Sequence, residues 1–218
     1  MKQRLSRRLL LFGALSMATR ANANPFYGTD EFTRDPTLLP PPESPIDFEI
    51  APVNLQLIPA KFHRQTVDFS GSELPGVIIV DPHQHMLYFT LGSGKAMRFG
   101  VGVGRDGFAW SGQALMNMKR SWPRWVPPTA MVFRDQNAAK WANGMPGGPD
   151  NPLGARALYL FANGEDTLYR IHGTNEPTSI GKSVSSGCIR LLNQDIAELY
   201  RLAPLGSNVT VLSGESAT

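Results

Sequence analysis

One cysteine and one histidine in this chain have the chemistry and the surroundings that acyl transfer requires. Cys188 is the only cysteine in 218 residues, and it follows Gly187 in the segment Ser-Ser-Gly-Cys-Ile-Arg at 185–190. A lone thiol forms no internal disulfide, so it is a packed core residue, a partner for another chain, or a nucleophile. At neutral pH only a few per cent of an ordinary thiol is ionised, so a nucleophile needs a base. His172, sixteen positions upstream and directly before Gly173, is the candidate base.

The glycine next to the thiol indicates how a reacting carbonyl would be stabilised. Gly187 and Cys188 begin a tight segment whose backbone N–H groups can point at one oxygen. Such donors stabilise a tetrahedral oxyanion by on the order of 3 kcal/mol each in acyl-transfer enzymes. These features predict acyl transfer through a thioester, a reaction for which no metal or redox cofactor is expected.

The alternative interpretation of Cys188 is inert packing. Free cysteine is among the most frequently buried residue types, and a single histidine is often structural. Glycines flank both Cys188 and His172, however, and a packed cysteine or histidine needs neither of them. The pair of motifs therefore favours the catalytic interpretation.

Two other motifs have the residue types of ligand sites but lack the context. His83 and His85 are two residues apart, which in a strand puts both on one face, yet no nearby set of Cys, Asp and Glu completes a metal site. We expect them in an exposed hairpin. The glycine-rich run at 100–104 lacks the strand, turn and helix order of a dinucleotide loop, and is typical of a strand that crosses close to another backbone.

An aromatic and proline-rich segment at 122–128 allows two interpretations. If the segment lines a groove, Trp122 and Arg124 are expected to contact substrate. If it is a rigid loop over the edge of the core, the same residues serve packing, because proline fixes the backbone.

The first 23 residues have the three parts of an export signal. A charged start precedes an apolar run at 9–18 that is too short to span a bilayer, and Ala21-Asn22-Ala23 forms a small-residue cleavage site. We therefore expect a signal peptide that is cleaved after Ala23, a periplasmic location and no stable membrane insertion. The paired Arg7 and Arg8 favour the twin-arginine route, with general secretion as the alternative.

Removal of this leader changes the charge of the chain. Five of the 21 Lys and Arg residues lie in the leader and none of the 18 Asp and Glu residues does, so 16 basic residues remain and the net charge becomes −2. That balance lacks the basic excess of a nucleic-acid-binding protein, and no nucleic-acid partner is expected.

The rest of the chain divides into an arm, one domain and a tail. Residues 24–60 form an irregular Pro-rich arm, because the prolines at 40–42 and 45 exclude helix and central strand. The arm either packs on the domain or tethers it. Residues 61–214 form a single domain, and 215–218 a C-terminal tail.

The domain is expected to be mostly β. Short runs rich in β-branched and aromatic residues predict strands at 77–80, 86–91, 97–103, 157–161, 169–172 and 209–212, of which the first two form a hairpin. Two short helices are expected beside them, at 136–143 with Asp135 as its cap and at 194–202 with Asn193 as its cap.

The ordered motifs around Cys188 resemble those of a known family. The similarity is to the catalytic signature of bacterial L,D-transpeptidases, the YkuD-type domain, and it is carried by His172-Gly173-Thr174-Asn175, Ile180-Gly181, the segment at 185–190, Asn193-Gln194-Asp195-Ile196 and Leu199-Tyr200. It extends upstream through residues 122–125 and 146–154. The resemblance implies a single β-sandwich or barrel-like catalytic domain with a few short helices.

The resemblance also implies roles for the motif residues. Cys188 would attack the carbonyl of the third-position diamino acid of a peptidoglycan tetrapeptide stem, and His172 would be the base that activates the thiol. The carbonyl of Gly173 would orient the imidazole, and the Gly187 and Cys188 amides would form the oxyanion hole.

Two more positions of the motif would bind substrate. Arg190 would hold a substrate carboxylate by paired hydrogen bonds. Ser186 stands where many family members carry histidine, and its hydroxyl can still donate a hydrogen bond.

The reaction implied by the resemblance is peptidoglycan L,D-transpeptidation. The terminal D-alanine leaves, and an amine of a second stem peptide or of an anchored envelope protein takes the acyl group. Carbapenem-type β-lactams would acylate the same thiol. Two alternatives stay open: transfer to water, which makes the protein an L,D-carboxypeptidase or a hydrolase of cell-wall links, and a non-catalytic wall-binding module in which Cys188 is buried.

Overall fold

The sheet of this protein is built from nine strands, and its strand order differs from the order along the chain. The computed structural model describes residues 46–71, 73–105, 110–185 and 187–213; the predicted leader, most of the Pro-rich arm, Ser186 and the C-terminal tail lie outside them. The order across the sheet is β1-β4-β3-β2-β11-β6-β7-β8-β10, and β5 and β9 form a separate pair. The strands are β1 (Gln65–Asp68), β2 (Ile78–Asp81), β3 (Met86–Gly92), β4 (Lys95–Gly100), β5 (Val103–Gly104), β6 (Gly112–Ser121), β7 (Arg156–Ala162), β8 (Glu165–His172), β9 (Ser183–Ser185), β10 (Ile189–Arg190) and β11 (Ser207–Val211). The prediction of a mostly β domain is confirmed.

The predicted hairpin is present as β2 and β3, which pair antiparallel. Asp81 ends β2 and its side chain accepts a hydrogen bond from the Gln84 amide at 2.9 Å, which closes the turn. His83 and Gln84 are exposed at this turn, as expected, whereas His85 is half-buried against Phe62.

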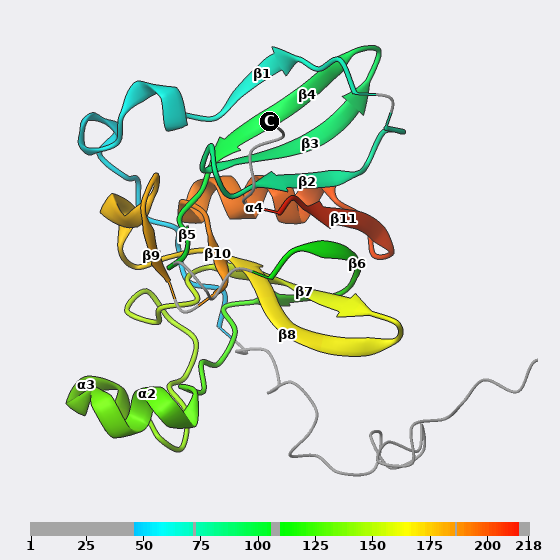
Figure 1. Cartoon of the computed structure of the whole chain (residues 1–218). Coiled ribbons are helices and arrows are strands. Elements are labelled where there is room, and N and C mark those ends of the chain that lie inside the picture. The colour runs from blue at the N-terminus through cyan, green and yellow to red at the C-terminus, as the bar shows by residue number, and fades with distance from the viewer. Residues whose placement is uncertain (1–45, 72, 106–109, 186, 214–218) are drawn as a thin grey trace, which may run out of the picture. The chain divides into compact units, whose positions relative to one another are not determined.

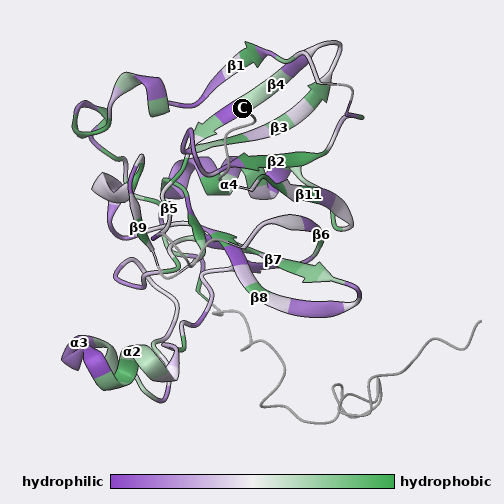
Figure 2. Ribbon diagram, in the orientation of Figure 1, coloured by the Kyte–Doolittle hydropathy of each residue, from purple (hydrophilic) through white to green (hydrophobic). Residues whose placement is uncertain are grey.

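The main core lies inside the bend of the sheet. Strands from both ends of the sheet contribute buried side chains to one cluster, including Ile78, Leu87, Phe99, Leu158 and Ile171. Figure 2 shows that β7 is largely hydrophobic, whereas β8 is largely hydrophilic. β8 therefore presents one face to the core and polar residues on the other.

Helix α4 (Asn193–Leu202) covers the core side of β7 and β8 (Figure 1). Its Ile196 and Leu199 are fully buried in the main core. At its end, Lys119 of β6 donates to the Ala203 carbonyl at 3.0 Å, which satisfies one of the acceptors that a helix leaves free. The predicted cap is wrong, because the helix begins at Asn193 itself and its N-cap is Leu192.

Two short helices follow the proline-rich segment. α3 (Gln136–Ala139) begins where predicted, and the Asp135 carboxylate accepts hydrogen bonds from the Asn137 and Ala138 amides, although the helix ends earlier than expected. α2 (Thr129–Arg134) was not predicted. Figure 1 shows the two helices side by side.

The described part of the arm packs on the domain. It contains two single 3-10 turns, η1 (Leu55–Leu57) and η2 (Ala60–Phe62), and a third, η3 (Pro177–Ser179), follows β8. Ile58 and Phe62 are buried with Met86, Ile180 and Leu192 in a second apolar cluster. Residues 46–62 are thus part of the domain surface rather than a free tether. Among the described residues, no helix is long and apolar enough to cross a membrane.

The glycine-rich run at 100–104 crosses close to other backbone, as predicted. Gly102 exchanges two backbone hydrogen bonds with Arg190, of 2.9 and 2.8 Å. A Cβ atom at Gly102 would lie 2.7 Å from the Ser179 carbonyl oxygen, so a larger residue would push the run away from η3. The two Gly102–Arg190 hydrogen bonds hold the edge of β10 that does not pair with β8. β10 is the strand that follows Cys188.

Candidate active site

The parallel pairing of β8 and β10 brings the two predicted motifs together. Ile189 pairs with Ile171, and Arg190 pairs with His172. Ile171 and Ile189 are buried in the main core. Because side chains alternate across a strand, His172 and Arg190 point to the opposite face. Cys188 directly precedes β10, and its thiol interacts with the backbone and the charge of Arg170 in β8.

The same face continues over two more strands. His172 pairs with Ala157 of β7, and Ala157 pairs with Arg120 of β6. Arg120, Ala157, His172 and Arg190 therefore form one row across the sheet. We call the face that carries this row the site face; α4 covers the other one.

The imidazole of His172 is held in one tautomer. Its Nδ1 lies 2.6 Å from the Gly173 carbonyl oxygen, and since a carbonyl only accepts, Nδ1 carries the hydrogen. His172 is buried, and this burial, followed by the charge of Arg190, lowers its pKa to about 4. Backbone hydrogen bonds with Gly173 and Leu153 act in the opposite direction. At neutral pH the ring is therefore neutral, and Nε2 is its basic nitrogen.

The thiol of Cys188 is half-buried. Burial raises its pKa, while a hydrogen bond with the Arg170 backbone and the charges of Arg170 and Arg190 act in the opposite direction. The resting pair is thus a neutral thiol and a neutral imidazole. The proton must leave the sulfur during attack, rather than before substrate binds.

One predicted oxyanion donor is already engaged. The Gly187 amide donates to Ser185 Oγ at 3.1 Å, and the Ser185 hydroxyl donates to the Cys188 carbonyl at 2.6 Å. The assignment of Gly187 to the oxyanion hole is therefore not realised in this arrangement. No described residue accepts a hydrogen bond from the Cys188 amide, which leaves that donor for an oxyanion.

Asn193 organises the segment after His172, a role that the sequence did not reveal. Its Oδ1 accepts hydrogen bonds from the Ala155 amide at 3.0 Å and from the Thr174 amide at 3.1 Å. A side chain at Gly173 would overlap this oxygen, which explains the glycine after the histidine. The only signal in the sequence was an asparagine at the start of a helix, which we interpreted as a cap.

Arg190 is partly paired. Its Nη1 donates to Glu176 Oε2 at 2.9 Å, and Glu176 is mostly exposed. Its Nε is buried and has no hydrogen-bond partner within the described ranges. The guanidinium thus retains capacity for a substrate carboxylate.

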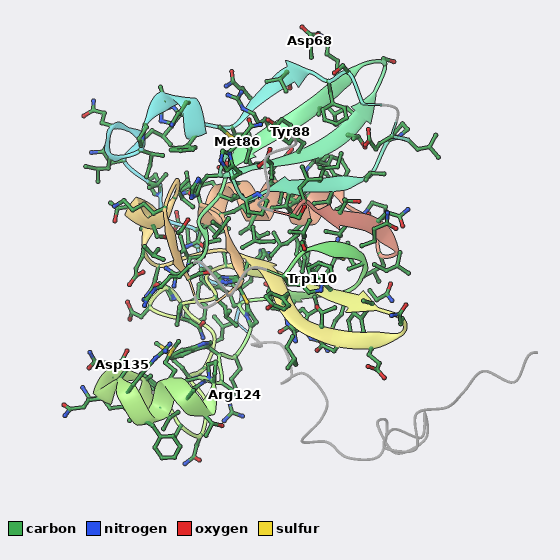
Figure 3. The ribbon with its side chains drawn as sticks, viewed as in Figure 1. Asp68, Met86, Tyr88, Trp110, Arg124 and Asp135 are labelled. Atoms are coloured by element: carbon green, nitrogen blue, oxygen red, sulfur yellow. The ribbon has the colours of Figure 1, made fainter. Side chains whose placement is uncertain are left out.

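The predicted contributions of the proline-rich segment differ from the structure. Trp122 is only 1% exposed, donates from Nε1 to Asp47 Oδ1 at 2.9 Å and packs edge-on against Phe48. This burial favours the rigid-loop interpretation over contact with substrate. Arg124 donates to the Asn143 carbonyl beside α2 and α3 (Figure 3), and no described contact joins it to the row on the site face. Ser186 lies outside the described residues.

The side chains in the described ranges form no group of three or more His, Cys, Asp or Glu residues that could hold a metal ion. The residues described above supply a thiol, an imidazole, a backbone donor and guanidinium groups. These are the parts that nucleophilic acyl transfer uses.

The family of the chain follows from its match to known proteins. The model of the YkuD family, the L,D-transpeptidase catalytic domain, matches residues 75–211. The chain belongs to this family. A relative from Escherichia coli K12, named Probable L,D-transpeptidase YbiS, is 34% identical over 140 residues, which cover 62% of this chain and 43% of the relative. The chain thus matches less than half the length of that relative.

Two solved structures are also similar to this chain. The Ldtfm–avibactam carbamoyl enzyme is 15% identical and covers 66% of this chain and 51% of that chain, with a TM-score of 0.50. A protein from Brucella melitensis, described as a Probable carnitine operon oxidoreductase, is 46% identical and covers 73% of this chain and 99% of that chain, with a TM-score of 0.49. The first similarity concerns the fold alone.

Proposed function

We propose that this protein is a cysteine-dependent peptidoglycan L,D-transpeptidase that works in the periplasm after export. The observation that carries the proposal is the pairing of β8 with β10, which sets His172 beside Arg190, two residues after Cys188. Family membership supports the reaction class.

In the first half of the reaction, a tetrapeptide stem acylates Cys188. As Sγ attacks the carbonyl carbon of the third residue, the thiol proton passes to Nε2 of His172. The Cys188 amide donates to the oxyanion that forms. Collapse of this intermediate breaks the peptide bond to D-alanine, whose nitrogen takes the proton from His172, and a thioester remains.

In the second half, an amine attacks the thioester. His172 is neutral again and accepts a proton from that amine, and the thiolate leaves and is reprotonated. The Gly173 carbonyl supports both halves, because it keeps the hydrogen on Nδ1 and stabilises the imidazolium that forms transiently. Arg190 binds the carboxylate of the D-alanine that is released.

The inhibitor expectation follows from the same nucleophile. The Ldtfm enzyme has been captured as an avibactam carbamoyl enzyme, and a strained β-lactam carbonyl traps a thiol in the same way as a substrate. We propose that carbapenem-type β-lactams acylate Cys188.

Product analysis tests the proposal. The mature chain is incubated with tetrapeptide stems, and the products are identified by mass spectrometry. Dimers with loss of D-alanine are expected, and Cys188→Ala is expected to produce none. Shortened monomers alone would mean transfer to water, and turnover by Cys188→Ala would exclude the cysteine mechanism.

A further inference from the structure

Arg120 is a cation of the site face that has no partner in the described structure. It is half-buried, its Nε is inaccessible to solvent, and no described residue forms a hydrogen bond or an ion pair with its guanidinium. The other two arginines of this face differ. Arg170 forms a bidentate pair with Asp166 at 2.6 and 2.7 Å, and Arg190 is paired with Glu176.

The strand register places Arg120 in the row of the catalytic base. Arg120 pairs with Ala157, which pairs with His172, which pairs with Arg190. With about 4.8 Å between neighbouring strands, the backbones of Arg120 and Arg190 lie roughly 14 Å apart. His172 lies between them.

Tyr159 gives an independent sign of where the Arg120 side chain points. Tyr159 of β7 pairs with Arg170, and the Arg170 guanidinium lies 4.1 Å from the ring centroid. Burial raises the pKa of the Tyr159 hydroxyl, and the charges of both Arg170 and Arg120 oppose that rise. The charge of Arg120 thus acts on a residue of the site face, in agreement with its register.

An unpaired guanidinium in this position is costly for the unliganded protein. Although Arg120 is only half-buried, its Nε is removed from water without gaining a partner, and such desolvation is unfavourable. Such a group is explained if a ligand supplies the missing acceptor. A planar guanidinium with a free Nε and free Nη atoms fits a carboxylate, which it can bind bidentately.

We propose that Arg120 forms a second carboxylate-binding subsite, which recognises a carboxylate of the donor stem other than the one released with D-alanine. This inference rests on the proposed function. The carboxylate of the released alanine lies three bonds from the scissile carbonyl, so it is within reach of Arg190, two residues after the nucleophile. A carboxylate on the second residue, or on the side chain of the third, lies farther away and on the other side of the scissile carbonyl. Arg120 stands on that side of His172.

The test compares stems that differ only in these carboxylates. kcat/KM for D-alanine release is measured for four tetrapeptides: both carboxylates free, the second residue amidated, the side chain of the third residue amidated, and both amidated. The native protein is expected to lose about tenfold or more on one of the singly amidated stems, since a hydrogen bond to a charged group is at stake. That stem identifies the carboxylate. In Arg120→Gln the ratio of kcat/KM for the free stem to kcat/KM for that amidated stem is expected to fall to near one.

Arg98 provides a matched control. Its Nε is also buried without a partner, although its Nη2 donates to the Lys61 carbonyl, and it lies on β4, which β3, β2 and β11 separate from β6. Arg98→Gln is expected to keep the native ratio. Arg120→Gln is expected to melt no lower than the native protein, because an unpaired cation is removed; a structural arginine would lower the melting temperature.

A binding measurement separates failure of this inference from failure of the proposed function. The same four stems are titrated against Cys188→Ala and against Cys188→Ala with Arg120→Gln. Preferential binding of the free stem by the first variant and not the second supports the subsite even if no stem is turned over. Equal affinity for free and amidated stems in Cys188→Ala, no binding of any stem, or an unchanged preference after Arg120→Gln, would overturn it.

Discussion

His172 and Arg190 are direct neighbours in the parallel ladder of β8 and β10. Burial and the adjacent guanidinium together lower the pKa of His172 to about 4. The cation that we assign to substrate binding thus adds to burial in keeping the base neutral. When a carboxylate neutralises Arg190, the imidazole can accept a proton more readily, so substrate binding and base strength are coupled.

The first prediction concerns His172→Gln. Loss of a general base typically costs about 10²- to 10⁴-fold in rate, so acylation of Cys188 by a carbapenem-type β-lactam should slow by that order. Stopped-flow absorbance of the β-lactam measures it. His63→Gln, which changes a half-buried histidine between η2 and β1, is the control and should acylate at the native rate. Native-like acylation by His172→Gln would exclude His172 as the base.

The second prediction is the acid limb of the pH profile. The kcat/KM profile reports the free enzyme, so activity should be lost only as the pH falls through about 4, where His172 becomes protonated. Arg190→Gln removes one cause of the lowered pKa and should move this limb to higher pH. In the native protein, the acid limb of the kcat profile should lie at higher pH than that of the kcat/KM profile, because bound substrate neutralises Arg190. A kcat/KM limb at the ordinary histidine value of about 6.5 would contradict the burial argument.

The third prediction concerns the Asn193 side chain. Asn193→Ala leaves the Ala155 and Thr174 amides without their acceptor, which should cost about 1–3 kcal/mol of unfolding free energy. The segment after His172 should loosen, and acylation should slow as well. Asn193→Asp keeps an acceptor oxygen and should retain more of both. Urea unfolding and the β-lactam assay measure the two effects, and an Asn193→Ala protein with native stability would show that these bonds contribute little.

The sequence was most informative where chemistry dictates residue type. The glycines beside Cys188 and His172 marked both motifs, and one of them is now explained by the lack of room between Gly173 and Asn193. The β2–β3 hairpin was also predictable, because apolar β-branched residues flank a turn that Asp81 closes.

What the sequence did not reveal depends on contacts between distant segments. Strand β6 was missed because a register shift between Met116 and Met118 interrupts its alternation and its second half is polar. The buried state of Trp122 depends on Asp47 and Phe48 of the arm. The occupation of the Gly187 amide depends on the rotamer of Ser185, which no spacing predicts.

The fourth prediction is a pH-dependent cost at Asp195 in the first turn of α4. Burial raises the pKa of its carboxyl to about 6, against opposing charges from Arg64 and His63. The folded state therefore binds this proton more tightly than the unfolded state, and stability falls as the pH rises from about 4 through about 6. The loss is on the order of 3 kcal/mol.

Asp195→Asn removes the ionisable carboxyl and with it this pH-dependent destabilisation. The free energy of unfolding of Asp195→Asn minus that of the native protein should be larger at about pH 7.5 than at about pH 4. The contribution of His172 is common to both proteins and cancels in this difference. Urea titrations at the two pH values provide the comparison. A difference that does not change with pH would show that Asp195 titrates normally.

The central claim is that Cys188 carries the acyl group. Its most direct test is the intact mass of the mature protein after brief mixing with a tetrapeptide stem and acid quenching, followed by peptide mapping. The expected result is an adduct equal to the stem minus D-alanine, located on the peptide that contains Cys188 and absent from Cys188→Ala. An adduct of that mass on Cys188→Ala, or release of D-alanine by the native protein with Cys188 blocked by an alkylating agent, would contradict the mechanism.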